Sequence, residues 1–238
     1  MNKIRLDQEL VKRGLVSTRS QAESFIKLGR IKVDGQVVTK PGLLTDDMSK
    51  LVLTGEQYVS RAGLKLASVA KALKLDFKNK TVLDVGSSTG GFTDYALQHG
   101  ASKVIAVDVG TQQLHQSLRA DKRIELHEKT DIRDFHTTEK VDIVVIDVSF
   151  ISLRAILSNV AKLSSHETQV VAMAKPQFEA GLTSKHKGVI KNDKMRRNTL
   201  KELENWIQKL FIIVDKADSK IQGSKGNTER FYLLKLAK

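Results

Sequence analysis

From Thr81 onwards the chain alternates short apolar runs with segments of helical periodicity, and this alternation restricts the possible folds strongly. Buried strands that alternate with helices form largely parallel sheets that are covered on both faces. We therefore predict an α/β, Rossmann-like fold with a mostly parallel sheet. The predicted strands are Thr81–Val85, Val104–Asp108, Ile124–His127, Ile143–Asp147, Gln169–Ala174, Phe211–Val214 and Phe231–Leu234.

A glycine-rich turn and three aspartates fall at the ends of four successive predicted strands. The turn runs from Asp84 to Phe92, and Asp108, Asp131 and Asp147 follow the next three strands. In folds of this class, ligands bind at the carboxyl ends of the strands. One such aspartate alone is explained equally well as a turn or helix cap. The turn and the three acids together predict a cofactor site.

The turn favours S-adenosylmethionine over a dinucleotide. NAD-binding turns follow the pattern G-x-G-x-x-G, whereas residues 86–91 read Gly-Ser-Ser-Thr-Gly-Gly. S-adenosylmethionine has no phosphates for such a turn to bind. We expect Asp108 to bind the ribose, Asp131 the adenine amino group, and Asp147 to lie beside the methyl donor. The predicted cofactor-binding residues are Asp84, Gly86, Ser87, Gly90, Gly91, Phe92, Asp108, Val109, Asp131, Ile132 and Asp147.

Residues 1–57 predict a separate small α+β domain. Leu6 and Leu10 mark one face of a short helix that Gly14 can end, and Ser17 or Thr18 can cap a second helix. A hairpin with Asp34-Gly35 at its turn follows, and Leu51–Leu53 is a further strand. A second domain, residues 58–238, then opens with a helix over Tyr58–Leu75 that Ser60 can cap.

Basic residues in this first domain flank turns and helix ends, where side chains and helix N-termini can meet phosphates together. Its net charge is only +3, from 10 Lys and Arg against 7 Asp and Glu in residues 1–57. The prediction of an RNA-binding surface therefore rests on clustering, and a solvated charged face is the alternative. The predicted RNA-binding residues are Lys12, Arg13, Arg19, Lys27, Arg30 and Lys32, together with Arg61 in the second domain.

The composition of the whole chain favours a polyanionic partner. There are 40 Lys and Arg against 27 Asp and Glu, a net charge of +13, which suits nucleic acid or an anionic membrane. The absence of cysteine excludes disulfides and thiolate metal sites, and the spacing of the six histidines supports no zinc site. We predict no metal and, without a signal peptide or membrane-length apolar run, a cytoplasmic location.

Four charged residues occur in local contexts that resemble RNA 2′-O-ribose methyltransferases of the FtsJ type. The contexts are residues 60–65 with Lys65, 145–150 with Asp147, 174–176 with Lys175, and 226–229 with Glu229. Residues 5–7, 17–22 and 29–35 resemble the S4 RNA-binding domain, named after a ribosomal protein of the small subunit. Together they make the chain similar to the hemolysin A (TlyA) family over nearly its whole length.

The resemblance implies that S-adenosylmethionine methylates a ribose 2′-hydroxyl of ribosomal RNA, either as naked RNA or in a ribosomal subunit. Lys175 is then the central catalytic residue. Lys65 and Glu229 orient the hydroxyl and tune Lys175, and Asp147 holds the set together. Enzymes that methylate amines typically carry Asn/Asp-Pro-Pro-Tyr after the fourth strand, where this chain has Asp-Val-Ser-Phe. That difference favours oxygen as the acceptor.

Two alternatives compete with this interpretation. A non-catalytic RNA-binding or ribosome-assembly factor would keep the fold, but the intact set of Lys65, Asp147, Lys175 and Glu229 argues against it. Direct membrane lysis is suggested only by the family's hemolysin name. The segment Phe178–Asn192 is basic and rich in glycine, which predicts a mobile loop that closes over RNA, with an ordinary solvent loop as the alternative.

Overall fold

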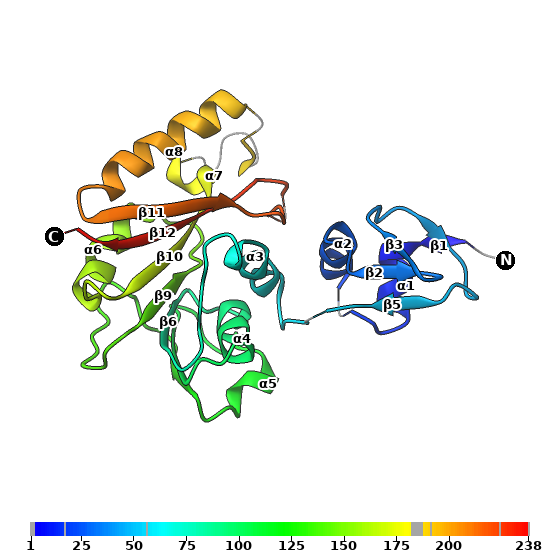
Figure 1. Ribbon diagram of the computed structural model, residues 1–238, viewed down its shortest axis with the longest axis horizontal. Coiled ribbons are helices and arrows are strands. Elements are labelled where there is room, and N and C mark those ends of the chain that lie inside the picture. Colours follow the sequence, from blue (N-terminus) through cyan, green and yellow to red (C-terminus); the bar gives the residue numbers. More distant parts are fainter. Residues whose placement is uncertain are drawn as a thin grey trace.

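The computed structural model describes residues 3–16, 18–55, 57–181, 188–190, 192–223 and 225–237. Figure 1 shows a small lobe, formed by the chain up to strand β5, and a larger lobe that begins at helix α3. Helix α2 of the small lobe faces α3 of the larger one, and the two helices are in contact.

The small lobe contains the predicted pair of helices and the predicted hairpin. Thr18 caps the second helix by accepting a hydrogen bond from the Gln21 amide, whereas Ser17 lies outside the described residues. Asp34 and Gly35 both have positive φ, at 50° and 84°, as a tight two-residue hairpin turn requires. The elements are β1 (Ile4–Arg5), α1 (Leu6–Lys12), α2 (Arg19–Lys27), β2 (Ile31–Val33), β3 (Gln36–Val38), β4 (Leu44–Thr45) and β5 (Leu51–Leu53).

Two small antiparallel sheets complete this lobe. Strand β2 pairs with both β3 and β5, as expected for a hairpin joined by a third strand. The pairing of β1 with β4, which joins Ile4 to Thr45, was not predicted. Strands of two residues leave no measurable alternation in a sequence, so this pairing depends on the tertiary fold alone.

The larger lobe is built around a seven-stranded sheet with the order β11-β12-β10-β9-β6-β7-β8. Strands β6 to β10 are parallel to their neighbours in this group, and β12 is antiparallel to β10 and to β11. The predicted mostly parallel sheet is therefore confirmed. The strands are β6 (Thr81–Val85), β7 (Lys103–Val107), β8 (Ile124–His127), β9 (Ile143–Ile146), β10 (Gln169–Ala174), β11 (Phe211–Asp218) and β12 (Arg230–Leu236).

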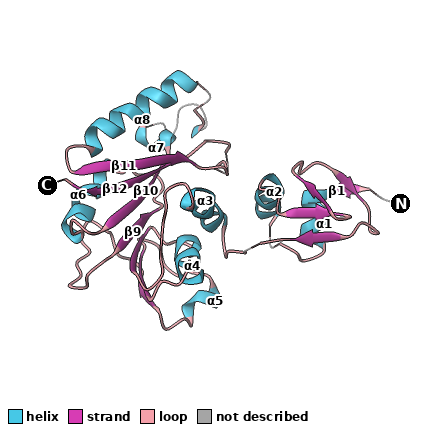
Figure 2. Cartoon of the chain, viewed as in Figure 1, coloured by secondary structure: helices cyan, strands magenta, loops and turns pink. Residues whose placement is uncertain are grey.

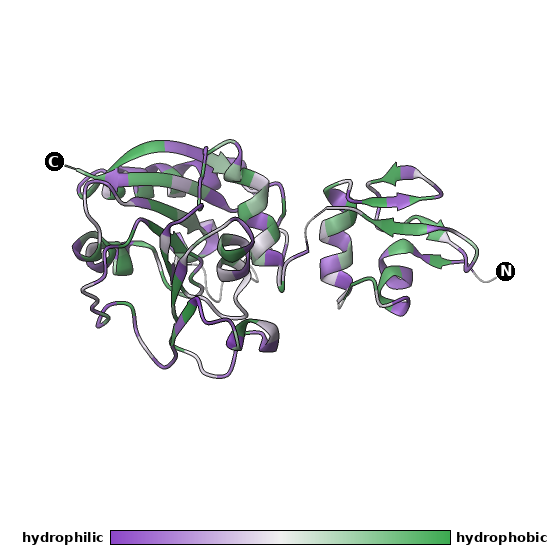
Figure 3. Cartoon of the chain, turned by 60° about the horizontal axis from the view of Figure 1, so that its bottom comes forward, coloured by the Kyte–Doolittle hydropathy of each residue, from purple (hydrophilic) through white to green (hydrophobic). Residues whose placement is uncertain are grey.

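Helices cover both faces of this sheet, as Figure 2 shows. One hydrophobic cluster joins alternate strand residues to α3, α4 and α5, and a second joins the intervening strand residues to α6 and α8. Figure 3 shows hydrophobic residues along the central strands. The helices are α3 (Arg61–Ala70), α4 (Gly91–Gln98), α5 (Gln116–Arg119), α6 (Arg154–Leu163), α7 (Pro176–Glu179) and α8 (Asp193–Ile207).

Several predicted boundaries differ from the structure. Strand β11 continues to Asp218 because its hairpin partner β12 supplies hydrogen bonds along that length. The helix expected over Tyr58–Leu75 is shorter, since α3 begins only at Arg61. Val59 is instead held in the preceding segment by a hydrogen bond from its amide to the Asp94 carboxylate, at 2.7 Å. Ser60 occupies the N-cap position of α3, but its side chain makes no cap hydrogen bond.

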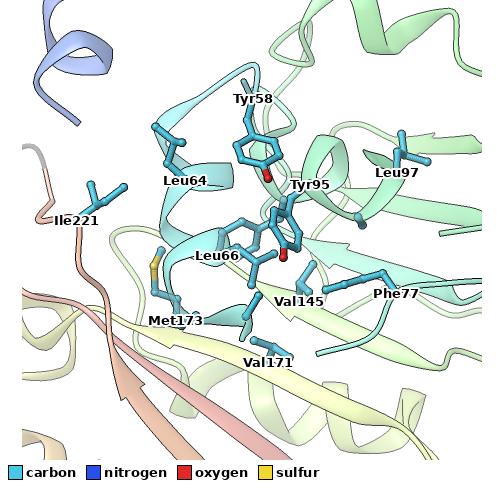
Figure 4. Close-up of a cluster of buried hydrophobic side chains, with 14 of the residues drawn as sticks. Tyr58, Leu64, Leu66, Phe77, Tyr95, Leu97, Val145, Val171, Met173 and Ile221 are labelled. Carbon is cyan, nitrogen blue, oxygen red and sulfur yellow. The ribbon is translucent and has the colours of Figure 1, made fainter. Parts of the chain in front are cut away.

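Helix α3 reaches the sheet through a very close contact with α4. A Cβ atom on Gly63 would lie 2.6 Å from Cβ of Tyr58 and 2.8 Å from the carbonyl oxygen of Gly91. Tyr58 is buried and packs on Tyr95, with ring centroids 5.4 Å apart. Figure 4 shows this cluster, in which Leu64 and Leu66 of α3 lie beside Tyr58 and Tyr95. The contact fixes the position of the helix that carries Lys65.

We predict that Gly63→Ala destabilises the protein although alanine is the better helix former. The helix propensity gained is about 1 kcal/mol, whereas overpacking a close contact typically costs about 1–3 kcal/mol. Urea unfolding monitored by circular dichroism should therefore show a lower midpoint than the wild type. A higher midpoint would show that α3 and α4 are not in this close contact.

Candidate active site

Two lysine–carboxylate pairs lie at the carboxyl end of the sheet. Lys175 follows β10 and its Nζ lies 2.6 Å from Oδ1 of Asp147, which follows the neighbouring strand β9. Nζ of Lys65, on α3, lies 2.6 Å from Oε2 of Glu229, which directly precedes β12. All four side chains are largely buried. A buried charge requires a partner of opposite sign, and each lysine has one.

A cavity of about 290 Å³ brings three of these four residues together. Its walls include Lys65, Lys175 and Glu229, with Ser149 and Phe150 on another side. We call it the acceptor cavity. The Lys175 ammonium also donates a hydrogen bond to Oγ of Ser149, at 2.7 Å.

A larger cavity of about 500 Å³ adjoins the acceptor cavity, and we call it the cofactor cavity. Its walls come from the loops after β6, β7, β8 and β9. Ser149 and Phe150 line both cavities, so they form the boundary between them. The predicted cofactor residues that line this cavity are Gly86, Asp108, Val109, Asp131, Ile132 and Asp147.

The carboxylates of Asp108 and Asp131 both bind other groups of the protein. Asp108 accepts hydrogen bonds from the backbone amides of Ser88 and Gly110, at 2.8 and 2.7 Å. Asp131 forms an ion pair with Arg133 at 2.6 Å. Hydrogen bonding to Arg133 lowers the pKa of Asp131. Arg133 was not among the predicted residues, and it lines the cofactor cavity together with Asp131.

A third, smaller cavity of about 80 Å³ lies under the glycine turn and contains unpaired oxygens. Its walls include Asp84, Ser87 and Ser60, and one side-chain oxygen of each is buried without a hydrogen-bond partner among the described residues. The other Asp84 oxygen accepts a hydrogen bond from Thr93 at 2.6 Å. Burial raises the pKa of Asp84 to about 7. A cationic group is what this cavity would hold best.

The remaining predicted residues of the glycine turn have different surroundings. Gly91 and Phe92 line the small cavity. Gly90 has a φ of 90°, and a Cβ there would lie 2.5 and 2.7 Å from side-chain carbons of Leu118 and Leu114. Gly90 therefore faces packed leucines, so its role is to permit the turn and the packing of α5.

The basic residues predicted in the small lobe divide into two groups. Arg13 is tied to Glu9 at 2.6 Å and to the carbonyl oxygens of Ser49 and Asp46, which gives it a structural role. Arg19 remains half exposed although it pairs with Asp7 at 2.7 Å. The residues Lys12, Lys27, Arg30 and Lys32 are partly or fully exposed.

Arg61 connects the two lobes. Its guanidinium donates to Oγ of Ser24 on α2, at 3.1 Å, and to the carbonyl oxygen of Gln222, at 2.6 Å. It also lines the acceptor cavity. Arg61, one of the predicted RNA-binding residues, thus lies at the junction of the small lobe and the acceptor cavity.

Besides Arg133, three residues at these sites were not given a site role from the sequence. Phe150 is 82% exposed and has a φ of 67°, and its position three residues after the strand-end Asp147 was the available signal. Arg5 pairs with the buried Asp7 beside Arg19. Ser60 was expected only as a helix cap. The exposure of Phe150, the pairing of Arg19 with Asp7 and the burial of the Ser60 hydroxyl depend on the packing of separate segments, so no local pattern reveals them.

Residues 182–187 and 191 of the predicted loop Phe178–Asn192 lie outside the described residues. Asn227, which is buried, accepts a hydrogen bond from the Ile190 amide and donates one to the Gly188 carbonyl. In the described part of the chain, no group of three or more His, Asp or Glu side chains is arranged to hold a metal ion.

Comparison with known proteins identifies both lobes. The FtsJ-like methyltransferase family matches residues 58–236, and the S4 domain matches residues 4–46. A 23S rRNA (cytidine-2′-O)-methyltransferase TlyA from Campylobacter jejuni is 44% identical over 80% of this chain and 75% of its own length. A 16S/23S rRNA (cytidine-2′-O)-methyltransferase TlyA from Mycobacterium tuberculosis is 36% identical over 97% and 89%, respectively.

A solved structure shares the whole architecture. It is a Streptococcus thermophilus protein that carries a hemolysin name, with 38% identity and a TM-score of 0.72 over 100% of this chain and 90% of its own. The match to this structure covers both lobes and all three cavities described above. The chain, which joins an S4 domain to an FtsJ-like domain, belongs to the TlyA family of FtsJ-like methyltransferases.

Proposed function

We propose that the protein transfers a methyl group from S-adenosylmethionine to a ribose 2′-hydroxyl of ribosomal RNA. One observation carries this proposal. The ion pair of Lys175 with Asp147 connects the acceptor cavity to the cofactor cavity, and the ion pair of Lys65 with Glu229 lines the acceptor cavity. The names of the two TlyA relatives indicate a cytidine as the acceptor nucleoside, and we propose the same for this chain. Ribosomal RNA as the substrate implies a cytoplasmic location.

The residues present fit S-adenosylmethionine. Asp108 and Asp131 would hold the ribose and adenine in the cofactor cavity, whose volume of about 500 Å³ suits a ligand of this size. The unpaired oxygens of Asp84, Ser87 and Ser60 would take the ammonium of its amino-acid end. When bound, the cofactor supplies a methyl group already activated on a sulfonium.

Because the methyl group is activated, positioning of the acceptor hydroxyl provides much of the rate. We assign this task to the two ion pairs. Lys65 and Glu229 would orient the ribose in the acceptor cavity. Lys175, which Asp147 and Ser149 hold in place, would accept the hydroxyl proton or stabilise the charge that develops on the oxygen.

Phe150 is our candidate for the residue that contacts the target base. A bulky residue with positive φ is strained by roughly 1–3 kcal/mol, and such strain clusters at functional sites. Its exposed ring lies 5.2 Å from that of Phe178, and both rings line the acceptor cavity. Unstacked RNA bases are commonly recognised by stacking on aromatic side chains. A base held there would place its ribose near Lys175.

The S4 lobe would supply the wider RNA contact. The buried Asp7 holds two half-exposed guanidiniums, those of Arg5 and Arg19, at 3.0 and 2.7 Å. Arginines fixed in this way are well suited to phosphates. The proposal extends to ribosomal RNA as free RNA or within a subunit.

The other candidate functions have less support. A non-catalytic assembly factor has no need of two buried ion pairs beside two adjoining cavities. For membrane lysis, none of the helices in the described ranges has the length and apolar character to cross a bilayer. Leakage of liposomes exposed to the purified protein would test lysis directly.

Substitution of Lys175 by alanine tests the catalytic assignment. We expect methyl incorporation into ribosomal RNA to fall by roughly 10²–10⁴-fold, the usual contribution of a positioned acid–base group. The affinity for S-adenosylhomocysteine should not change. The exposed Lys162 on α6 provides the control, and Lys162→Ala should retain full activity. Near-normal turnover of Lys175→Ala would remove this residue from its assigned role.

Asp84→Asn tests the ammonium site. Asparagine can still accept from Thr93 but carries no charge, so the affinity for S-adenosylhomocysteine should fall. The affinity for 5′-methylthioadenosine should not change, because this compound lacks the amino-acid end. The raised pKa of Asp84, about 7, also predicts that wild-type affinity increases as the pH rises towards 7, because the carboxylate becomes ionised. Calorimetric titration at several pH values measures both effects.

The same substitution has a predictable effect on stability. An acid whose pKa is raised on folding binds more protons in the folded state, so its contribution to stability decreases as the pH rises from about 4 to 7. Asp84→Asn should therefore be at least as stable as the wild type at pH 8 in thermal unfolding.

Unchanged affinity of Asp84→Asn for S-adenosylhomocysteine would contradict the ammonium site.

Removal of residues 1–57 tests the RNA-binding assignment. The cut leaves Tyr58, which packs against Tyr95, so the remaining chain should fold and bind S-adenosylhomocysteine. It should bind ribosomal RNA more weakly and with a shallower dependence on salt, because phosphate contacts are lost. RNA titrations of both proteins at several salt concentrations measure this. Equal affinity and equal salt dependence would show that the S4 lobe does not bind this RNA.

A further inference from the structure

Glu179 is a buried carboxylate that plays no part in the proposed chemistry. Its side chain is 1% exposed, and it faces the loop that follows β9 rather than either cavity. One carboxylate oxygen accepts from Oγ of Ser152 at 2.5 Å, and the other accepts from the Leu153 amide at 2.9 Å. Arg154 lies within 3.8 Å of the carboxylate.

These bonds cap helix α6 from a distant part of the chain. Leu153 occupies the N-cap position of α6, and its own side chain provides no cap hydrogen bond. The carboxylate of Glu179, at the end of α7, supplies the missing cap by accepting the hydrogen bond from the Leu153 amide. The Glu179 amide in turn donates to the carbonyl oxygen of Lys175, at 3.2 Å. Glu179 therefore joins the start of α6 to the short helix that begins at the candidate catalytic lysine.

The two segments joined by Glu179 carry the residues on both sides of the boundary between the cavities. The loop after β9 contains Asp147, Ser149 and Phe150, and the segment after β10 contains Lys175 and Phe178. Beside the acceptor cavity, these segments touch through the Lys175–Asp147 ion pair and through the Phe150–Phe178 ring contact. The hydrogen bonds of Glu179 join the same two segments in the protein interior, and they do not depend on substrate.

Burial raises the pKa of Glu179, so the environment disfavours the charge of this side chain. Both of its oxygens are nevertheless hydrogen-bonded, and a neutral acceptor of the same shape can form part of this arrangement. Glutamine keeps one carbonyl oxygen for the Leu153 amide. Alanine leaves that amide and the Ser152 hydroxyl without their partner.

We propose that Glu179 is a positioning residue, which clamps the loop after β9 onto α7 and so holds Phe150 against Phe178 at the acceptor cavity. This inference rests on the proposed function, since it assigns Phe150 the target base. It extends that function by naming the group that determines where the base can stack. Phe150, with its strained backbone, keeps its position only when the surrounding loop is fixed.

The first test compares Glu179→Ala, Glu179→Gln and Ser152→Ala with the wild type. We expect Glu179→Ala to lower kcat on ribosomal RNA by roughly 10- to 100-fold, the range that a displacement of about 1 Å can produce. Glu179→Gln should restore most of the activity, and Ser152→Ala should lose part of it. S-adenosylhomocysteine affinity should be unchanged in all three. Glu167→Ala, at an exposed glutamate paired with Lys140, is the surface control.

A double-mutant cycle with Phe150→Ala then separates positioning from general destabilisation. If Glu179 acts through Phe150, the double variant should have nearly the same kcat and RNA affinity as Phe150→Ala alone. Additive losses would overturn the proposal, as would a fully active Glu179→Ala. Should Glu179→Ala fail to fold, the same cycle with Ser152→Ala decides the question.

The assay also distinguishes the two proposals. An inactive wild type counts against the proposed function, and the cycle on RNA affinity still measures the coupling of Glu179 to Phe150. An active wild type with additive losses overturns only the role of Glu179.

Discussion

The pairing of two lysines with two carboxylates in a mostly buried site is the constraint on which the rest of the structure depends. Each pair joins segments that are far apart in sequence, 28 residues for Asp147 and Lys175 and 164 for Lys65 and Glu229. A single buried charge would destabilise the fold, since removal of one partner leaves the other unpaired. Strands β9 and β10 must therefore pair before Lys175 is accommodated, and the leading helix and the final hairpin must assemble on the sheet before Lys65 is.

The sheet and the close helix contact satisfy that requirement in different ways. Parallel strands β9 and β10 end side by side, so Asp147 and Lys175 meet because of sheet register alone. Lys65 depends on α3, which approaches α4 through Gly63 and Gly91 with no room for a methyl group. The antiparallel strand β12 then brings Glu229 to the same edge. Each cavity wall is thus a consequence of backbone packing as well as of side-chain chemistry.

Much of the fold followed from local sequence, and less of the site did. Strands β6 to β10 were predictable because their residues are apolar over a short run, and the hairpin because Asp34-Gly35 accepts positive φ. The start of α3 was not predictable, because Val59 is held by Asp94 of another helix. The sequence predicted Arg13 to be an RNA-binding residue, yet its guanidinium donates hydrogen bonds to the carbonyl oxygens of two residues more than thirty positions along the chain.

The sequence by itself determined which acids and glycines follow the strands, and hence where a ligand can bind, because strand ends are set by local apolar runs. It also carried the residue types of the family. Only the tertiary structure decided which lysine pairs with which acid, and that Phe150 is exposed at the boundary of two cavities while Glu179 is buried behind it. These properties depend on distances between segments, and such distances are fixed by the packing of the whole sheet and its helices.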